Sequence, residues 1–170
     1  MGMLFMTAQA GASDPENTLY LETQTGRVVI EMRPDLAPKH VEQIKSLTRK
    51  GFYDGVVFHR VIDGFMAQTG DPTGTGMGGS GNKLAAEFSR EPHVRGTASM
   101  ARAQDPNSAD SQFFIVFAPA PFLDGQYTVW GKVTEGMEHI DQVKKGDQRN
   151  NGVVSNPDRI VSMRVAADVQ

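Results

Sequence analysis

The sequence contains no cysteine among its 170 residues, and this absence excludes several kinds of site. A chain without thiols forms no disulfide, no thiolate metal site and no cysteine nucleophile. The length suits one domain that buries a hydrophobic core without such crosslinks.

Long apolar runs and a basic surplus are also missing. No stretch approaches the roughly 18 apolar residues that a membrane-spanning helix needs. The net charge of −3 gives no electrostatic reason to expect nucleic acid or an anionic membrane as a partner. With 39% hydrophobic and 22% charged residues, the composition is that of a soluble globular domain.

The first 17 residues lack the features of a full export signal. No Lys or Arg precedes Arg27, and the apolar run Leu4-Phe5-Met6 is too short for such a signal. We therefore expect a disordered tail over residues 1–17, a folded domain over 18–170 and a cytoplasmic protein. A shortened export signal, with a periplasmic location, is the alternative.

Short runs with β-strand character dominate the remaining chain. Alternating apolar and polar residues at 19–23 and 28–32 predict a hairpin that turns at Thr25-Gly26. Further strands are expected at 56–62, 65–68, 97–101, 112–117, 128–133 and 160–166. Gly, Pro, Asp or Asn turns separate most of these runs.

Two helices interrupt these strands. The first begins near Pro38 and buries Val41, Ile44 and Leu47 on one face, with Gly51 as its left-handed C-cap. The second is expected over residues 137–145. Seven or eight short strands with few long crossovers favour a mainly β fold, an antiparallel barrel or sandwich.

The segment Gly74–Gly79 has the G-x-G-x-x-G spacing of a dinucleotide fingerprint, but its surroundings do not fit. That fingerprint must follow a buried strand and open a helix, whereas Asp71-Pro72-Thr73 precedes the segment and Ser80-Gly81-Asn82 follows it. We interpret it as a flexible surface loop that binds no nucleotide.

The histidines give no sign of a metal site. His40, His59, His93 and His139 do not pair with one another or with acids at a metal-ligand spacing. His40 and His139 lie on predicted helices and are expected to be solvated. No serine lies in a G-x-S-x-G elbow, so the sequence shows no candidate nucleophile for a hydrolase triad. No cofactor is expected.

Arg60 lies in a run that is otherwise apolar, where a charge is costly unless it is paired or faces a cleft. An isolated arginine of this kind often extends from an edge strand into solvent. Gln68, however, lies beyond an Asp63-Gly64 turn, so that the two strands could pair and the amide could hold the guanidinium. Together with Phe65 and Met66, the hairpin would form a peptide-binding site.

Several segments, in order along the chain, resemble the cyclophilin family. They are Phe58–Asp71, Ser99–Ala103, Asn107-Ser108 with Ser111–Ile115, Phe122–Gly125, and Val129–Val133 with Gly136-Met137. The resemblance covers roughly residues 19–166. The Gly74–Gly81 loop and the following Asn82–Phe88 are typical of the short bacterial members.

The resemblance implies a closed eight-stranded antiparallel β-barrel capped by two helices, and a peptidyl-prolyl cis-trans isomerase acting on peptides and folding proteins. It implies that Arg60 is the catalytic guanidinium. The proline pocket would be lined by Phe65, Met66, Phe114 and Leu123. Substrate backbone would be bound by Gln68, Ala101, Arg102 and Gln112, with Ala103 beside the neighbouring subsite. A non-catalytic proline-peptide binding module or chaperone is the alternative.

The chain departs from the best-known members of the family at the groove. Arg102 replaces a usual Asn and is expected to act through its backbone, Phe122 replaces a frequent Trp, and Tyr127 replaces a frequent His. These changes predict weak cyclosporin binding with the reaction retained. Trp130, in place of a Phe, is expected to pack in the core. We expect a monomer that binds no nucleic acid and no membrane.

Overall fold

The computed structural model describes residues 14–169, and the fold is mainly β. The strands are β1 (Thr18–Glu22), β2 (Arg27–Met32), β3 (Arg60–Ile62), β4 (Met66–Thr69), β5 (Thr97–Met100), β6 (Phe113–Val116), β7 (Val129–Glu135) and β8 (Ser162–Val165). The α-helices are α1 (Pro38–Arg49) and α2 (Met137–Asp141). Short 3-10 helices are η1 (Pro15–Asn17), η2 (Pro121–Leu123), η3 (Gln148–Asn150) and η4 (Ala166–Val169). No helix within this described part is long and apolar enough to cross a membrane.

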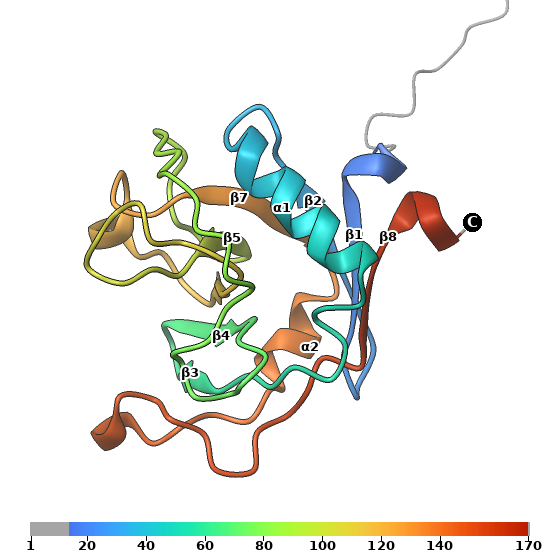
Figure 1. The fold of residues 1–170 in the computed structure, drawn as a ribbon. Coiled ribbons are helices and arrows are strands. Elements are labelled where there is room, and N and C mark those ends of the chain that lie inside the picture. Colours follow the sequence, from blue (N-terminus) through green and yellow to red (C-terminus); the bar gives the residue numbers. More distant parts are fainter. Residues whose placement is uncertain (1–13, 170) are drawn as a thin grey trace, which may run out of the picture.

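The eight strands form one antiparallel sheet in the order β3-β4-β6-β5-β7-β2-β1-β8. The sheet curves into a half-barrel with α1 across its upper end and α2 near its lower end (Figure 1). The prediction of a closed barrel is wrong, because β3 and β8 remain at opposite ends of the order. Residues 55–58, ahead of β3, are joined to residues 158–160, ahead of β8, by an isolated bridge between Val57 and Arg159 and by backbone hydrogen bonds, but β3 and β8 themselves do not pair.

The open edge has a physical cause in the segment 146–154. This segment takes the free side of β3, where the Val61 amide donates to the Gly152 carbonyl at 2.9 Å and Val153 bridges to Arg60. The edge that would have to pair with β8 is therefore occupied. The expected strand 56–62 is reduced to β3, because residues 55–58 make their backbone hydrogen bonds to residues 158–160 and not to β4.

The sheet buries side chains on both faces, as β6 shows. Phe113 and Ile115 point into the main core, whereas Phe114 and Val116 belong to a second apolar cluster on the other face. Successive residues of a strand point to opposite faces, so one continuous apolar run supplies both clusters. Trp130 lies in the main core at 0% exposure, edge-on to Phe113, which confirms its predicted packing role.

Helix α1 begins at Pro38 as predicted, and Gly51 has the expected left-handed conformation just beyond its end. The prediction of a solvated His40 is wrong, since this side chain is buried. Its Nδ1 lies 2.6 Å from Oε1 of Glu87, which also accepts the His40 backbone N–H at 2.9 Å. Glu87 thus caps the helix from a distant loop, a role that Ala37 at the N-cap cannot fill. Desolvation lowers the pKa of His40, although Glu87 opposes the shift.

The second helix is shorter than predicted and ends at Asp141. The amide of Lys144 donates to the Asp158 carboxylate at 2.8 Å, outside the helical pattern. His139, predicted to be solvated, is partly buried and lies 2.9 Å from the Thr25 hydroxyl.

Residues 1–13 lie outside the described residues, and with them most of the predicted tail and the export-signal alternative. Residues 14–17 of that tail belong to the fold. Glu16 of η1 makes ion pairs of 2.8 Å with both Lys45 and Arg49 of α1. Arg49 also pairs with Asp168 of η4, so that both ends of the described chain meet at this end of the helix (Figure 1).

Candidate active site

One row of residues crosses four strands on the outer face of the sheet. Arg60 on β3 is paired in register with Gln68 on β4, Gln68 with Phe114 on β6, and Phe114 with Ser99 on β5. Residues directly opposite on neighbouring strands lie about 5 Å apart. The row therefore places a guanidinium, an amide and an aromatic ring side by side, and it confirms the predicted pairing of Arg60 with Gln68.

The aromatic end of this row forms an apolar hollow. Met66, Phe114 and Leu123 are buried in the second cluster, with Phe65 and Tyr127 partly exposed at its rim. The Tyr127 ring stands edge-on to Phe114, with 5.8 Å between centroids. The pocket above them has a volume of about 370 Å³, within the range of small-ligand sites.

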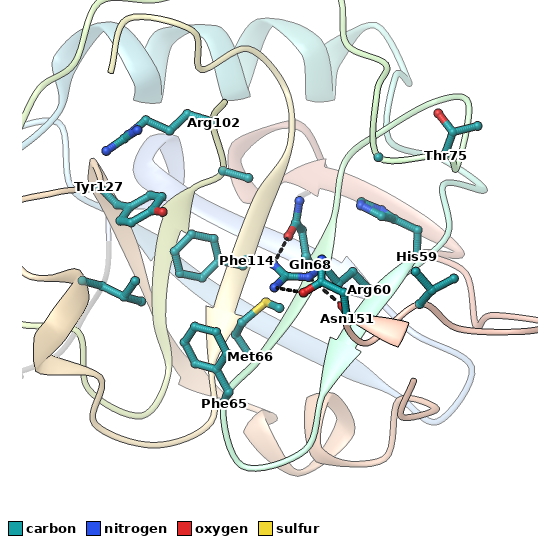
Figure 2. A pocket seen from close by; sticks show the side chains of 14 residues that line it. His59, Arg60, Phe65, Met66, Gln68, Thr75, Arg102, Phe114, Tyr127 and Asn151 are labelled. Atoms are coloured by element: carbon teal, nitrogen blue, oxygen red, sulfur yellow. Dashed lines mark hydrogen bonds between the residues drawn. The ribbon is translucent and has the colours of Figure 1, made fainter. Parts of the chain in front are cut away.

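The guanidinium of Arg60 lies at the polar end of the pocket and is held by three neutral acceptors (Figure 2). Its Nη1 donates to Oε1 of Gln68 at 3.2 Å, Nε to the Asn151 carbonyl at 2.9 Å, and Nη2 to Asn151 Oδ1 at 3.0 Å. No carboxylate in residues 14–169 forms a salt bridge with it. Desolvation lowers the pKa of Arg60, partly offset by Tyr127, but an arginine remains charged at any working pH.

A chain of amides joins Arg60 to the glycine-rich loop. Gln68 donates to Gln112 at 2.9 Å, and Gln112 donates to the carbonyls of Gly76 and Gly78 at 3.0 and 2.9 Å. The Asp71 carboxylate, fully buried, accepts the amides of Gly76 and Gly78 from the other side.

Burial raises the pKa of Asp71, but hydrogen bonds from Thr73, Gly76 and Gly78 outweigh it and bring the pKa to about 2. The loop that we interpreted as flexible is thus tied down at several points. Its Thr75 and Gly76 form part of the pocket wall.

The Arg102 side chain is held by several contacts at the groove, while the predicted role of its backbone stays a prediction. Its guanidinium donates to the carbonyls of Ala103, Gln104 and Gln126 at 2.7–3.2 Å and lies 4.6 Å from the centre of the Tyr127 ring. The residue joins the segments on either side of the groove and stacks on its outer aromatic wall.

His93 supports the apolar end from behind. Its ring stacks on Phe114 at 6.2 Å, with Nδ1 3.0 Å from Asp124 Oδ1 and Nε2 2.9 Å from Ser99 Oγ. These are the residue types of a hydrolase triad, but Ser99 is 0% exposed and its hydroxyl donates to the Thr128 carbonyl. No substrate can reach that oxygen, so the set serves to hold Asp124 and η2 against Phe114.

Most of the predicted site residues meet in one place. The pocket is lined by the predicted Arg60, Phe65, Met66, Gln68, Ala101, Arg102, Phe114, Leu123 and Tyr127. Ala103 and Gln112 line a neighbouring pocket of about 520 Å³ that shares Gln68, Ala101 and Arg102 with the first. Phe122 lies outside both pockets, 69% exposed, with its ring 5.4 Å from Phe65. The roles assigned to these residues stay predictions.

Sequence reasoning missed His59, Thr75, Gly76, Asn151 and Val153, which complete the lining. Asn151-Gly152 is a turn signal, but a turn signal does not tell which strand the turn will contact. Among the described residues, no cluster of His, Asp and Glu could hold a metal ion.

This geometry suits a reaction that needs no nucleophile. An apolar hollow of this size can hold a small ring, and an uncompensated cation next to it can offer N–H donors to an atom whose lone pair becomes available. Neutral acceptors leave the positive charge in place, whereas a carboxylate would cancel it.

Comparisons with known proteins show which family the chain resembles. The model of the family described as cyclophilin type peptidyl-prolyl cis-trans isomerase matches residues 18–165. A probable peptidyl-prolyl cis-trans isomerase of Brucella suis is 56% identical, covering 95% of this chain and 88% of the relative. A peptidyl-prolyl cis-trans isomerase of Synechococcus elongatus is 43% identical over 87% of this chain and 95% of its own.

Solved structures are similar as well. A cyclophilin from Hirschia baltica has a TM-score of 0.83 at 31% identity, covering 93% of this chain and 77% of that one. A cyclophilin type isomerase from Cryptosporidium parvum, crystallised in the presence of the dipeptide Ala-Pro, has a TM-score of 0.79 at 30% identity. It covers 87% of this chain and 98% of that one.

Proposed function

The chain belongs to the cyclophilin family of peptidyl-prolyl cis-trans isomerases, and we propose that it catalyses this reaction by stabilising a twisted X-Pro amide with Arg60. Its substrates are X-Pro segments of peptides and of unfolded or folding proteins. The Ala-Pro dipeptide of the Cryptosporidium parvum structure supports a proline-containing ligand for this groove.

The mechanism follows from the electronic structure of the amide. The barrier to rotation is about 18–20 kcal/mol because the nitrogen lone pair is delocalised into the carbonyl. When the C–N bond twists, that lone pair localises on the prolyl nitrogen and becomes a hydrogen-bond acceptor. A guanidinium N–H directed at the nitrogen therefore binds the transition state more strongly than either ground state, which lowers the barrier.

The pocket supplies the other half of the mechanism. Met66, Phe114 and Leu123 hold the pyrrolidine ring by apolar contact, so that the carbonyl side of the bond rotates while the ring stays still. No proton is transferred, and no covalent intermediate is formed.

The observation that carries this proposal is the uncompensated Arg60, held by Gln68 and Asn151 at the edge of the apolar pocket. A charge of this kind is costly to keep half-buried without an ionic partner. A groove that only binds proline peptides has no use for it.

Arg60→Ala tests the assignment. Loss of one preorganised electrostatic donor costs about 10²–10³ in turnover, and we expect that loss in a coupled assay on a short Ala-Pro peptide. Arg27→Ala, on β2 and paired with Glu22 away from the groove, is the matched control and should keep wild-type turnover.

A near wild-type rate for Arg60→Ala would show that Arg60 is not catalytic. If the wild-type protein binds the peptide but does not accelerate its isomerisation, the chain is a binding module instead. Thermal unfolding of each variant separates a loss of turnover from a loss of folded protein.

A further inference from the structure

The strongest unexplained contact at the site is the one between Arg60 and Asn151, residues far apart in the chain. Arg60 has five N–H donors, and three of them are used within the described protein. Asn151 accepts two of these three, one with its backbone carbonyl and one with its side-chain oxygen. Figure 2 shows Asn151 next to the guanidinium, on the side away from Phe65 and Phe114.

The loop that carries Asn151 is bound tightly to the strand that carries Arg60. Val61 donates to the Gly152 carbonyl at 2.9 Å, Gly146 to the Val61 carbonyl at 2.8 Å, and Val154 to the His59 carbonyl at 3.1 Å. A Cβ on Gly152 would lie 2.5 Å from a side-chain carbon of Ile62, so the loop approaches β3 too closely for any larger residue. The loop is therefore anchored to the strand on both sides of Arg60.

The backbone at Asn151 is left-handed, with φ 54° and ψ 28°. Among residues other than glycine, Asn and Asp are the ones that most readily take this conformation. The left-handed turn directs the carbonyl and the side-chain amide oxygen of one residue to the same edge of the guanidinium. Two N–H groups, one on each Nη nitrogen, then have no acceptor within the described protein.

We infer that Asn151 is a positioning residue that fixes the angle of the Arg60 guanidinium and so directs its free N–H groups at the substrate amide. The inference rests on the proposed role of Arg60. Asn151 supplies neutral acceptors and thereby leaves the positive charge uncompensated. Its own side chain is exposed and holds no other described residue, so its side-chain contact serves Arg60 alone.

Asn151→Gly is the informative variant. Glycine adopts the left-handed conformation without steric cost and keeps the backbone carbonyl, so only the side-chain acceptor is lost. A misplacement of 1 Å can cost about 100-fold in rate, but the Asn151 carbonyl and Gln68 still hold the group. We expect kcat/KM for a short Ala-Pro peptide to fall about tenfold, mainly in kcat, with KM within about twofold of wild type.

Asn156→Gly is the matched control. Asn156 is an exposed asparagine with φ 51° in the same part of the chain, and it does not line the pocket. Its variant should keep wild-type kcat and KM. A purely structural role for Asn151 predicts that Asn151→Gly behaves like this control, with an unchanged or higher melting temperature and full activity.

A double-mutant cycle with Arg60→Ala separates the two hypotheses. If Asn151 acts through Arg60, Asn151→Gly costs about tenfold in the wild-type background and nothing in the Arg60→Ala background. If Asn151→Gly keeps wild-type kcat/KM while Arg60→Ala loses it, this inference is overturned and the proposed mechanism is retained. An equal loss in both backgrounds also overturns it. Near wild-type activity of Arg60→Ala itself overturns the proposed mechanism.

Discussion

The two ends of the groove are built by different physical means. At the apolar end, Met66, Phe114 and Leu123 are buried parts of a cluster that helps to hold the sheet and η2 together. At the polar end, Arg60 is half-buried and rests on hydrogen bonds to Gln68 and Asn151. Changes at the apolar end should therefore alter stability and substrate affinity together, whereas changes at the polar end should alter rate and leave the fold intact.

The largest effect is expected at the apolar end, from Phe114→Ala. A buried Phe→Ala substitution lowers the free energy of unfolding by about 3–5 kcal/mol, and the lost ring contact should also raise KM. Denaturant unfolding and steady-state kinetics measure the two effects. Phe122→Ala, which removes a mostly exposed ring of the same size, should lower the unfolding free energy by less than about 1 kcal/mol. Equal stabilities of the two variants would contradict the distinction between the ends.

Phe122→Trp tests the outer wall of the apolar end with a ligand. We propose that the chain binds cyclosporin weakly because Phe122 offers an apolar face but no N–H donor. A restored indole N–H should improve binding by about 1–3 kcal/mol, or about 5–150-fold. Titration of both proteins with the drug measures the change, and peptide turnover should stay the same. Tight binding by the wild-type protein, unchanged by the substitution, would show that this residue does not decide affinity.

Gln68→Leu tests the polar end with a change that keeps side-chain volume. It removes one acceptor of Arg60 and breaks the amide chain to Gln112 and the glycine-rich loop. We expect kcat/KM to fall about tenfold, an effect of about 1.4 kcal/mol, mostly in kcat. The free energy of unfolding should change by about 1 kcal/mol or less. A rise in KM alone would place Gln68 in substrate binding and not in the support of Arg60.

The smallest effect is expected from a change of pH. It should leave kcat/KM, which depends on the polar end, unchanged, and it should alter stability through His93 behind the apolar end. The proposed mechanism uses no titrating acid or base, so kcat/KM should be flat over roughly pH 6–8, and a bell-shaped profile would overturn it. His59 also lines the polar end, and burial lowers its pKa, which favours the neutral imidazole. Behind the apolar end, burial lowers the pKa of His93, while Asp124 opposes the shift.

The sign of the His93 effect on stability follows from proton binding. Since the folded-state pKa lies below the unfolded value of about 6.5, the unfolded chain binds more protons between the two values. The contribution of His93 is therefore complete above about pH 6.5 and is lost as the pH falls through the folded pKa. Melting curves of the wild-type protein and His93→Asn from pH 5 to 8 should show a weaker pH dependence in the variant. Some pH dependence of the melting temperature should remain in His93→Asn, because burial also lowers the pKa values of His40 and His59.

Local features of this protein could be read from its sequence because their partners lie close along the chain. Arg60 and Gln68 flank the Asp63-Gly64 turn, so the register of one hairpin was enough to bring them together. The first helix likewise has its start and stop signals at Pro38 and Gly51. The resemblance to a family then assigned roles to further residues, most of which line one pocket.

Features that depend on distant contacts could not be read in this way. The closed barrel was a wrong prediction because the segment 146–154 occupies the edge of β3, and a strand pattern does not say what will pair with its edge. His40 was placed in solvent because a helix position does not reveal that Glu87, from another loop, covers it.

The sequence by itself therefore determined most of the strand pattern, the start and stop of the first helix, and the hairpin that carries Arg60, Phe65, Met66 and Gln68, whereas Phe114 and Leu123 were assigned to the pocket by the family resemblance. Periodicity and turn chemistry act over a few residues, so they are visible in one dimension. Only the tertiary structure decided the open edge of the sheet, the burial of His40 and His93, and the placement of Asn151 against Arg60. These depend on which distant segments meet, because a buried or half-buried polar group must find its hydrogen-bond partner wherever the packed chain provides one.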